Sequence, residues 1–257
     1  MGLYFNADEL PQVHGEYVLW CDGMGTGGAL STSLSHVANF VFKLHRAFGD
    51  VVGKVSDARL YPLMDGMYVT SVSRDSIQTV IRNAFVKLAK EFVAHADVHK
   101  HFIVRAAVAY GATLHGSDVP DEAFVYGIGT EHETKNRKAF SNSTLNQTRS
   151  ALLLSSAMAI AYHTESIAPP FGVYVHDSAL SVPQLVNPRD GGFPSHLWSW
   201  WRGNAAASTI AKKLAPAIEQ YFTQAEQQSR NIDYPLEAIN KHREALSEYF
   251  GDYLPKK

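Results

Sequence analysis

Two aspartates are the residues of this chain whose type and spacing could do chemistry. Asp22 directly follows a short apolar run at residues 16–21, and Asp65 lies between two extended runs further along the chain. Two carboxylates pressed together repel each other unless a cation lies between them. Hard divalent ions such as Mg²⁺ and Mn²⁺ prefer oxygen ligands of this kind and commonly share them with substrate phosphates. The pair therefore predicts a divalent metal site.

A run of glycines after the first aspartate supplies a second feature. Gly23, Gly25, Gly27 and Gly28 let backbone N–H groups turn inward to bind an anion, and a following helix N-terminus adds partial positive charge. Metal-binding acids beside such a loop predict a nucleoside triphosphate site. The same glycine spacing matches the dinucleotide fingerprint. That interpretation fails because a hairpin follows the helix, where the dinucleotide fold requires a parallel strand.

The elements that must position these residues follow the order β-α-β-β-α-β, the ferredoxin-like arrangement of an α+β fold. In this topology the first and third strands are antiparallel neighbours, so the end of the first, at Asp22, lies beside the start of the third, at Asp65. Asp65-Gly66 between two extended runs is itself a strong hairpin signal. Apolar patterning predicts strands and helices at the following places: strands at 16–21, 58–63, 67–72 and 102–110, and helices from 31 to about 49 and from 73 to 96.

The rest of the chain predicts one more catalytic segment and a helical appendage. A strand is expected at 124–128, a polar connector at 131–143, one long helix at 144–163 and a strand at 172–176. The composition changes after Pro188, and alanine- and glutamine-rich stretches predict helices at 205–228 and 236–250. We therefore expect a catalytic domain over residues 1–187 and a C-terminal helical extension over residues 188–257.

Composition and charge exclude several classes of protein. A net charge of −2, from 23 basic and 25 acidic residues, argues against a nucleic-acid partner. Cys21 is the only cysteine, so an internal disulfide and a cysteine-rich zinc site are both excluded, and a buried core cysteine is expected. No apolar stretch reaches membrane-spanning length, and residues 1–8 do not resemble a signal peptide. We expect a cytoplasmic protein without a membrane partner.

Over about residues 15–180 the chain resembles the class III nucleotidyl cyclases. The first metal-binding aspartate of that family has a glycine three positions on, as Asp22 has Gly25. The second lies in a strand–strand hairpin, as Asp65 does. The strand that usually reads Arg-Ile-Gly-Ile-His-x-Gly is matched loosely by residues 105–111. Together and in order, these motifs imply the βαββαβ core of a class III cyclase.

The chain departs from the family pattern in three places. Met64 stands where the family has a glycine. The Asn-x-x-x-Arg of the late helix is absent, and the nearest candidates are Asn146 and Arg149, which share a helix face. Four residues before Asp65, where a residue that reads a purine normally stands, the chain has Tyr61. An aromatic residue there resembles the pyrimidine cyclases of bacterial antiphage (Pycsar) systems, whose cyclic UMP or cyclic CMP activates a separate effector.

The resemblance implies a lyase reaction that converts UTP to 3′,5′-cyclic UMP and pyrophosphate. Two Mn²⁺ or Mg²⁺ ions would be held by Asp22, Asp65 and the Gly23 carbonyl. One ion would lower the pKa of the ribose 3′-OH, and the other would offset charge on the triphosphate. The implied substrate-binding residues are Gly23, Gly25, Thr26, Tyr61 and Arg105.

The resemblance also implies a homodimer with two shared active sites, because the family takes its metal ligands from one chain and its late-helix residues from the other. Arg149 would stabilise charge on the α-phosphate, and Asn146 would position the ribose. Strand alternation puts Tyr61 on the same face as Asp65, above the metal site. Its bulk should shorten the base pocket and favour a pyrimidine.

Several alternatives stay open. Nothing in these residues separates uracil from cytosine, so a cytidylate cyclase is one alternative. A purine nucleotide cyclase is another. A degenerate cyclase that binds a nucleotide or a partner without turnover is disfavoured by the two intact aspartates. A diguanylate-cyclase-like palm domain ranks low because the chain has no Gly-Gly-Asp/Glu-Glu-Phe hairpin.

Overall fold

The described residues form a mixed α+β fold on one six-stranded sheet. The computed structural model of the chain describes residues 13–25, 33–95, 101–119, 125–126, 138–139, 142–182, 192–227, 234 and 236–254. The strand order is β2-β3-β1-β4-β7, and β8 pairs with β4 outside this path. The strands of this sheet are β1 (His14–Met24), β2 (Ala58–Leu63), β3 (Gly66–Ser71), β4 (Ile103–His115), β7 (Leu153–Ser155) and β8 (Val173–Val175).

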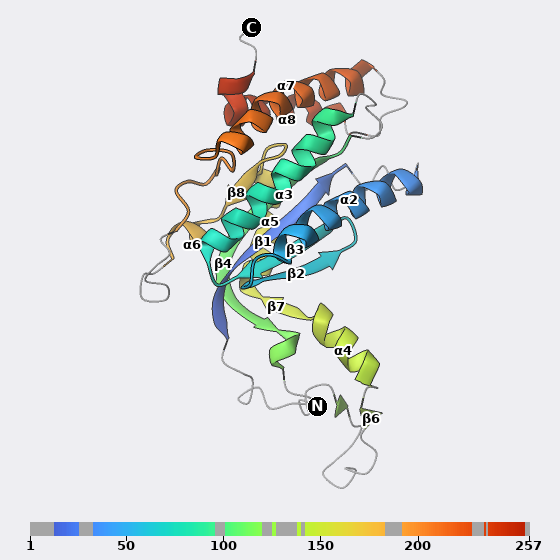
Figure 1. Cartoon of the computed structure of the whole chain (residues 1–257), viewed down its shortest axis with the longest axis vertical. Coiled ribbons are helices and arrows are strands. Elements are labelled where there is room, and N and C mark those ends of the chain that lie inside the picture. The colour runs from blue at the N-terminus through green and yellow to red at the C-terminus, as the bar shows by residue number, and fades with distance from the viewer. Residues whose placement is uncertain are drawn as a thin grey trace.

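The predicted β-α-β-β-α-β order is confirmed. The chain runs through β1, α2 (Leu34–Val52), β2, β3, α3 (Arg74–Ala94) and β4, with α2 and α3 side by side on one face of the sheet (Figure 1). β1 lies between β3 and β4 and is antiparallel to both. The β2–β3 hairpin closes at Met64 and Asp65, as the Asp-Gly signal predicts.

Serine caps begin both helices of this core, but the first helix ends later than predicted. The Ser33 hydroxyl accepts the His36 N–H, and the Ser73 hydroxyl accepts the Ser76 N–H. α2 continues past Gly49, although glycine costs a helix about 1 kcal/mol. Phe48 and other apolar residues of its last turns are buried in the core, and this burial outweighs that cost.

The single helix predicted over 144–163 is wrong. The structure has α4 (Asn142–Ala151), then β7, then α5 (Ser156–Thr164). β7 pairs with the end of β4, and Ser155 caps α5 by accepting the Ala157 and Met158 N–H groups. Pairing with a sheet edge therefore overrides the local helical pattern.

The remaining elements follow the prediction more closely. β8 covers most of the strand predicted at 172–176, and α6 (Asp177–Leu180) follows it. The strand predicted at 124–128 is shorter, as β5 (Val125–Tyr126) paired with β6 (Lys138–Ala139), and most of the predicted connector lies outside the described residues. The two C-terminal helices are confirmed as α7 (Ala205–Gln227) and α8 (Leu236–Phe250).

One large apolar core joins the sheet to the C-terminal helices. It includes the inward side chains of β1 and the buried residues of α2, α3, α7 and α8. Trp200 is fully buried there, and its indole N–H donates to the Phe171 carbonyl at 2.9 Å. The proposed domain boundary at 187 lies outside the described residues. Beyond it, α7 packs on α3 and α8 packs on α7 (Figure 1). Cys21 is buried in this core, as expected.

The opposite face of the sheet carries a smaller cluster under α5. Val18, Trp20, Tyr61, Tyr68 and Ala107 form it with the buried alanines of α5. No helix in the described part of the chain is long and apolar enough to cross a membrane.

Candidate active site

The structure brings the two aspartates together at one end of this face. In the β1–β3 register Asp22 lies opposite Gly66, which directly follows Asp65. In the β1–β4 register Asp22 lies opposite Arg105. Met64 precedes Asp65 in the turn with φ of 42°, a left-handed conformation that glycine adopts without strain.

The pKa of Asp22 records how crowded this end is. Burial, followed by the charges of Glu165 and Asp65, raises it from 3.8 to about 7. The Gly23 N–H, which donates to Asp22 Oδ1 at 2.8 Å, and the charge of Arg105 act in the opposite direction. Among the described residues that act on the Asp22 pKa, the carboxylates of Asp65 and Glu165 outnumber the cation of Arg105, which fits a site for a further cation.

Glu165 is a third carboxylate that sequence reasoning missed. It begins the short helix η6 (Glu165–Ile167), directly after α5, and only 6 % of the residue is exposed. Burial raises its pKa, although Arg105 donates a hydrogen bond from Nε to its Oε1 and opposes the shift. The signal in the sequence that could have indicated this carboxylate is Arg105, because an arginine in a buried strand needs an acidic partner.

The donor set at this end fits a divalent ion bound through few protein ligands. Among the residues that the structure describes, no three histidine, cysteine or acidic side chains are placed to hold one ion. An ion at this end would be held by Asp22 and Asp65 and would complete its shell with backbone oxygen, water or phosphate, as Mg²⁺ commonly does.

An aromatic group lies next to the aspartates. Trp20 covers Gly66 so closely that a Cβ at that glycine would come within 2.3 Å of the indole. The Trp20 ring lies 4.4 Å from Tyr68 and 5.7 Å from Tyr162 between ring centroids, and Tyr162 is 55 % exposed. Burial, followed by the charges of Tyr162 and Asp22, raises the pKa of Tyr68 to about 12. A flat ligand beside Asp22 would meet aromatic surface here.

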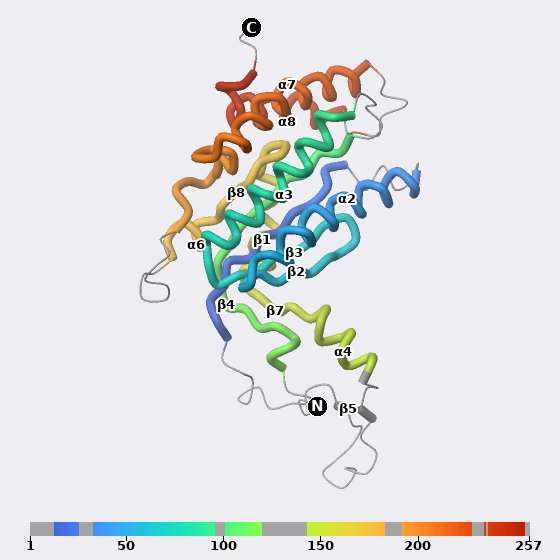
Figure 2. Tube along the Cα trace, in the orientation of Figure 1, coloured from blue at the N-terminus to red at the C-terminus, as the bar shows by residue number. Residues whose placement is uncertain are grey.

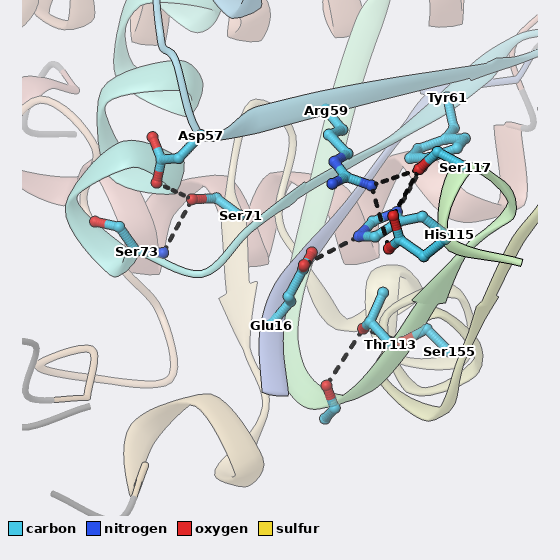
Figure 3. A network of polar contacts seen from close by, with 12 residues as sticks. Glu16, Asp57, Arg59, Tyr61, Ser71, Ser73, Thr113, His115, Ser117 and Ser155 are labelled. Atoms are coloured by element: carbon cyan, nitrogen blue, oxygen red, sulfur yellow. Dashed lines mark hydrogen bonds and ion pairs between the residues drawn. The ribbon is translucent and has the colours of Figure 1, made fainter. Parts of the chain in front are cut away.

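Tyr61 lies on the predicted face, but its hydroxyl is directed toward the other end of the sheet. The residue is 9 % exposed, and its hydroxyl lies 2.5 Å from His115 Nδ1 (Figure 3). His115 Nε2 lies 3.0 Å from Glu16 Oε1. Burial alone would raise the pKa of Glu16, but the hydrogen bond from His115 and nearby positive charge lower it instead. Neither His115 nor Glu16 was singled out from the sequence.

Arg149 and Asn146 also lie at this second end. Both belong to α4, which extends beyond the end of β4 that holds His115 (Figure 2). Arg149 Nη2 donates to the Val119 carbonyl at 2.7 Å, and Asn146 is exposed. β4 continues from Arg105 to His115, and α4 lies beyond that end, so most of the length of β4 separates Arg149 from Asp22. Within one chain, Arg149 is therefore far from Asp22.

The glycine-rich segment is only partly described. Gly23 is buried near the end of β1, and Gly25 turns the chain with φ of 82°. That angle is one that residues other than glycine rarely adopt. Thr26 and the glycines after it lie outside the described residues.

Comparisons with known proteins found similar structures but no related sequences. No protein-family model matches the chain, and a search of curated proteins gave no match. The fold is similar to the dimeric guanylyl cyclase domain of a fusion protein from the aquatic fungus Blastocladiella emersonii, with a TM-score of 0.43 and 12 % identity over 65 % of this chain and 83 % of that chain.

Two further cyclase structures are similar to about the same extent. A guanylate cyclase domain from Catenaria anguillulae in complex with GTP has a TM-score of 0.41 and 12 % identity over 65 % of this chain and 81 % of that chain. A bacterial light-regulated adenylyl cyclase has a TM-score of 0.41 and 8 % identity over 61 % of this chain and 41 % of that chain. Because these TM-scores lie below 0.5, the functional assignment rests on this chain's own residues.

Proposed function

We propose that this protein is a nucleotidyl cyclase that converts a nucleoside triphosphate to a 3′,5′-cyclic nucleotide and pyrophosphate. The observation that carries the proposal is the meeting of Asp22 and Asp65 at the end of β1, opposite Arg105. Excess negative charge there suits two divalent ions, Mn²⁺ or Mg²⁺. The cation of Arg105 suits the triphosphate that would accompany them.

The residues of this end would bind and orient, with no protein nucleophile. Asp22, Asp65 and the Gly23 carbonyl would hold the ions, which supply a lowered pKa at the ribose 3′-OH and charge neutralisation at the leaving pyrophosphate. The hydrogen bond from the Gly23 N–H to Asp22 Oδ1 fixes that carboxylate in one orientation. Arg105, Gly25 and Thr26 would contact the phosphates. Trp20 and Tyr162 offer apolar surface beside them.

The second end of the sheet supports a shared site in a homodimer. Arg149 lies beyond the end of β4 that holds His115, and the Tyr61 hydroxyl contacts His115 at the same end. A two-fold dimer can place this end of one chain against the aspartates of the other, which gives two equal sites. Arg149 would then stabilise charge on the α-phosphate, and Asn146 would position the ribose.

Base selection is the finest part of the proposal. The hydrogen bond to His115 holds the Tyr61 ring in one position, and a fixed bulky ring can exclude a purine by clash. We propose UTP as the substrate and cyclic UMP as the product, which would act in bacterial antiviral defence through a separate effector. UTP over CTP rests on the resemblance alone. The remaining alternatives are a purine cyclase and a catalytically inactive nucleotide-binding protein.

Product formation from each nucleotide tests the proposal. Purified protein is incubated with UTP, CTP, ATP or GTP and with Mn²⁺ or Mg²⁺, and cyclic products are identified by mass spectrometry. We expect cyclic UMP and pyrophosphate in equal amounts, and none from an Asp65→Asn control. A cyclic purine product would support cyclase activity but refute the proposed preference for a pyrimidine base. Nucleotide binding without any cyclic product would favour the inactive nucleotide-binding protein.

A further inference from the structure

We infer that Glu165 is a positioning residue that holds the Arg105 guanidinium beside Asp22, where it meets the phosphates of the substrate. The inference rests on the proposed function. It adds a residue without which the Arg105 guanidinium would not be held in one position. Glu165 itself touches neither metal nor substrate in this arrangement.

The contact between Glu165 and Arg105 uses Nε of the arginine and leaves its terminal NH₂ groups for another anion. Arg105 donates from Nε to Glu165 Oε1, and both side chains are largely buried. A guanidinium that uses Nε for one carboxylate still has its two terminal NH₂ groups for a second, bidentate anion. Since Arg105 lies opposite Asp22 in the strand register, that second anion would be bound at the metal end of the sheet.

The backbone that carries Glu165 is fixed to the strand that carries Arg105. The Glu165 N–H donates to the Ala161 carbonyl at the end of α5, and the Glu165 carbonyl accepts from the Ala168 N–H at 2.9 Å. The chain then reaches β4 again, where the Phe171 N–H donates to the Val104 carbonyl at 2.7 Å. Glu165 is therefore held between two segments that both pack on β4.

A metal-ligand role and a purely structural role explain the pair less well. Among the described residues, no three acidic or histidine side chains are grouped around one ion, so Glu165 is not placed as a third ligand. A buried ion pair is a weak source of stability, since two apolar residues of similar volume often serve as well or better. Glu165 also adds negative charge near Asp22, and this repulsion destabilises the folded protein when no metal is bound. A positioning role accounts for the pair despite these costs.

Direct binding measurements test this inference without turnover. We compare wild type, Glu165→Gln and a matched control, Glu16→Gln, which alters the other buried glutamate on the same sheet face. Mn²⁺ affinity is measured by electron paramagnetic resonance, and tripolyphosphate affinity in Mg²⁺ by calorimetry. Glu165→Gln should weaken tripolyphosphate binding about tenfold although it removes a charge that repels phosphate, because the Arg105 guanidinium is no longer held in place. Mn²⁺ affinity should fall by a smaller factor, because Glu165 supplies negative charge near Asp22 but no ligand. Glu16→Gln should change neither.

A double mutant shows whether Glu165 acts through Arg105. Arg105→Gln should weaken tripolyphosphate binding at least as much as Glu165→Gln, and the double variant should match Arg105→Gln alone. Additive losses, unchanged tripolyphosphate binding, or a larger loss of Mn²⁺ affinity than of tripolyphosphate affinity in Glu165→Gln would overturn the positioning role. If Glu165→Gln does not fold, Glu165→Asp, which keeps the charge but shortens the reach, must weaken tripolyphosphate binding in the same direction.

The same measurements separate this inference from the proposed function. A wild-type protein that binds neither Mn²⁺ nor tripolyphosphate would overturn the proposed function and the inference with it. A wild-type protein that binds both, but loses nothing in Glu165→Gln, would overturn the inference alone.

Discussion

Asp22 and Glu16 lie on one strand and one face of the sheet, yet their surroundings shift their pKa values in opposite directions. At Asp22, burial and two neighbouring carboxylates raise the pKa to about 7. At Glu16, burial also acts to raise the pKa, but the hydrogen bond from His115 and nearby positive charge outweigh it and lower the pKa. Among the described residues, negative charge therefore exceeds positive charge at the Asp22 end of the sheet, whereas the Glu16 carboxylate is paired with His115.

The difference separates a candidate binding site from a supporting network. Unbalanced negative charge at Asp22 costs stability in the metal-free protein and is relieved by a bound cation. The Glu16–His115–Tyr61 network requires no ligand and holds an aromatic side chain still (Figure 3). The predictions below test whether the two ends differ in this way.

The largest expected effect is on turnover at the Asp22 end. Asp22→Ala or Asp65→Ala should lower cyclic nucleotide formation by at least about 10³-fold, because each removes a ligand from two-metal catalysis. Circular dichroism should show an unchanged fold. Product formation at the wild-type rate in both variants would refute the metal assignment.

Mixed dimers test whether the two ends meet across chains. Asp65→Ala and Arg149→Ala chains should each be inactive, but about half of randomly exchanged dimers are mixed, and each of these has one intact site. Roughly a quarter of wild-type activity should then return. No recovery, despite exchange shown by differently tagged chains, would mean that Arg149 does not act across the interface.

Unfolding free energies should change in opposite directions at the two ends. At pH 8 without metal, Asp22→Asn should stabilise the protein by about 1–2 kcal/mol, because it removes one of the repelling charges. Glu16→Gln should destabilise it by about 1–3 kcal/mol, because buried His115 loses its charged partner. Urea unfolding measures the free energy of unfolding of both variants. Changes of the same sign would contradict the predicted difference between the two ends of the sheet.

The pH dependence should also differ. Because the folded pKa of Asp22 exceeds its unfolded value, its contribution favours folding below about pH 4 and is lost as the pH rises through about 7. Its partial exposure limits this loss to about 2 kcal/mol. Asp22→Asn should therefore flatten metal-free stability between pH 4 and 8.

Glu16 should show the reverse pH dependence. Its folded pKa is lowered, so its contribution is present above the unfolded pKa and is lost as the pH falls through the folded value. Glu16→Gln should therefore remove stability at pH 7 and change little in strong acid. Stability curves of the two variants that run parallel would contradict this contrast.

The smallest expected effect is on base selection. Tyr61→Ala should raise the relative kcat/KM for purine over pyrimidine triphosphates about tenfold, since it removes the ring that shortens the pocket. His115→Ala should cause a smaller shift in the same direction, because it frees that ring. An unchanged ranking of the four nucleotides in Tyr61→Ala would mean that another residue selects the base.

Much of the core and the two aspartates could be predicted because their signals are local. An apolar run ending at Asp22 and an Asp-Gly turn at Asp65 each identify a strand end within a few residues. The βαββαβ order then implies that these two ends are neighbours, and the β1–β3 register agrees. Arg105 could be named as a candidate, but its acidic partner could not.

The residues that could not be predicted depend on contacts between distant segments. The break between α4 and α5 arises because β7 pairs with the end of β4, and this pairing moves Arg149 away from Asp22. Glu165 reaches Arg105 only because α5 and β8 both pack on β4. His115 meets Glu16 only because β4, which carries the histidine, pairs with β1, which carries the glutamate.

The sequence by itself determined which carboxylates end the first strand and enter the hairpin, because strand and turn propensities act over a few residues. Only the tertiary structure decided which carboxylates are satisfied and which are not. The reason is that the free energy of a buried charge depends on the partners that other segments bring near it. Asp22 and Glu16 come from the same strand, and what lies beside each of them makes the first a candidate ligand and the second part of the framework.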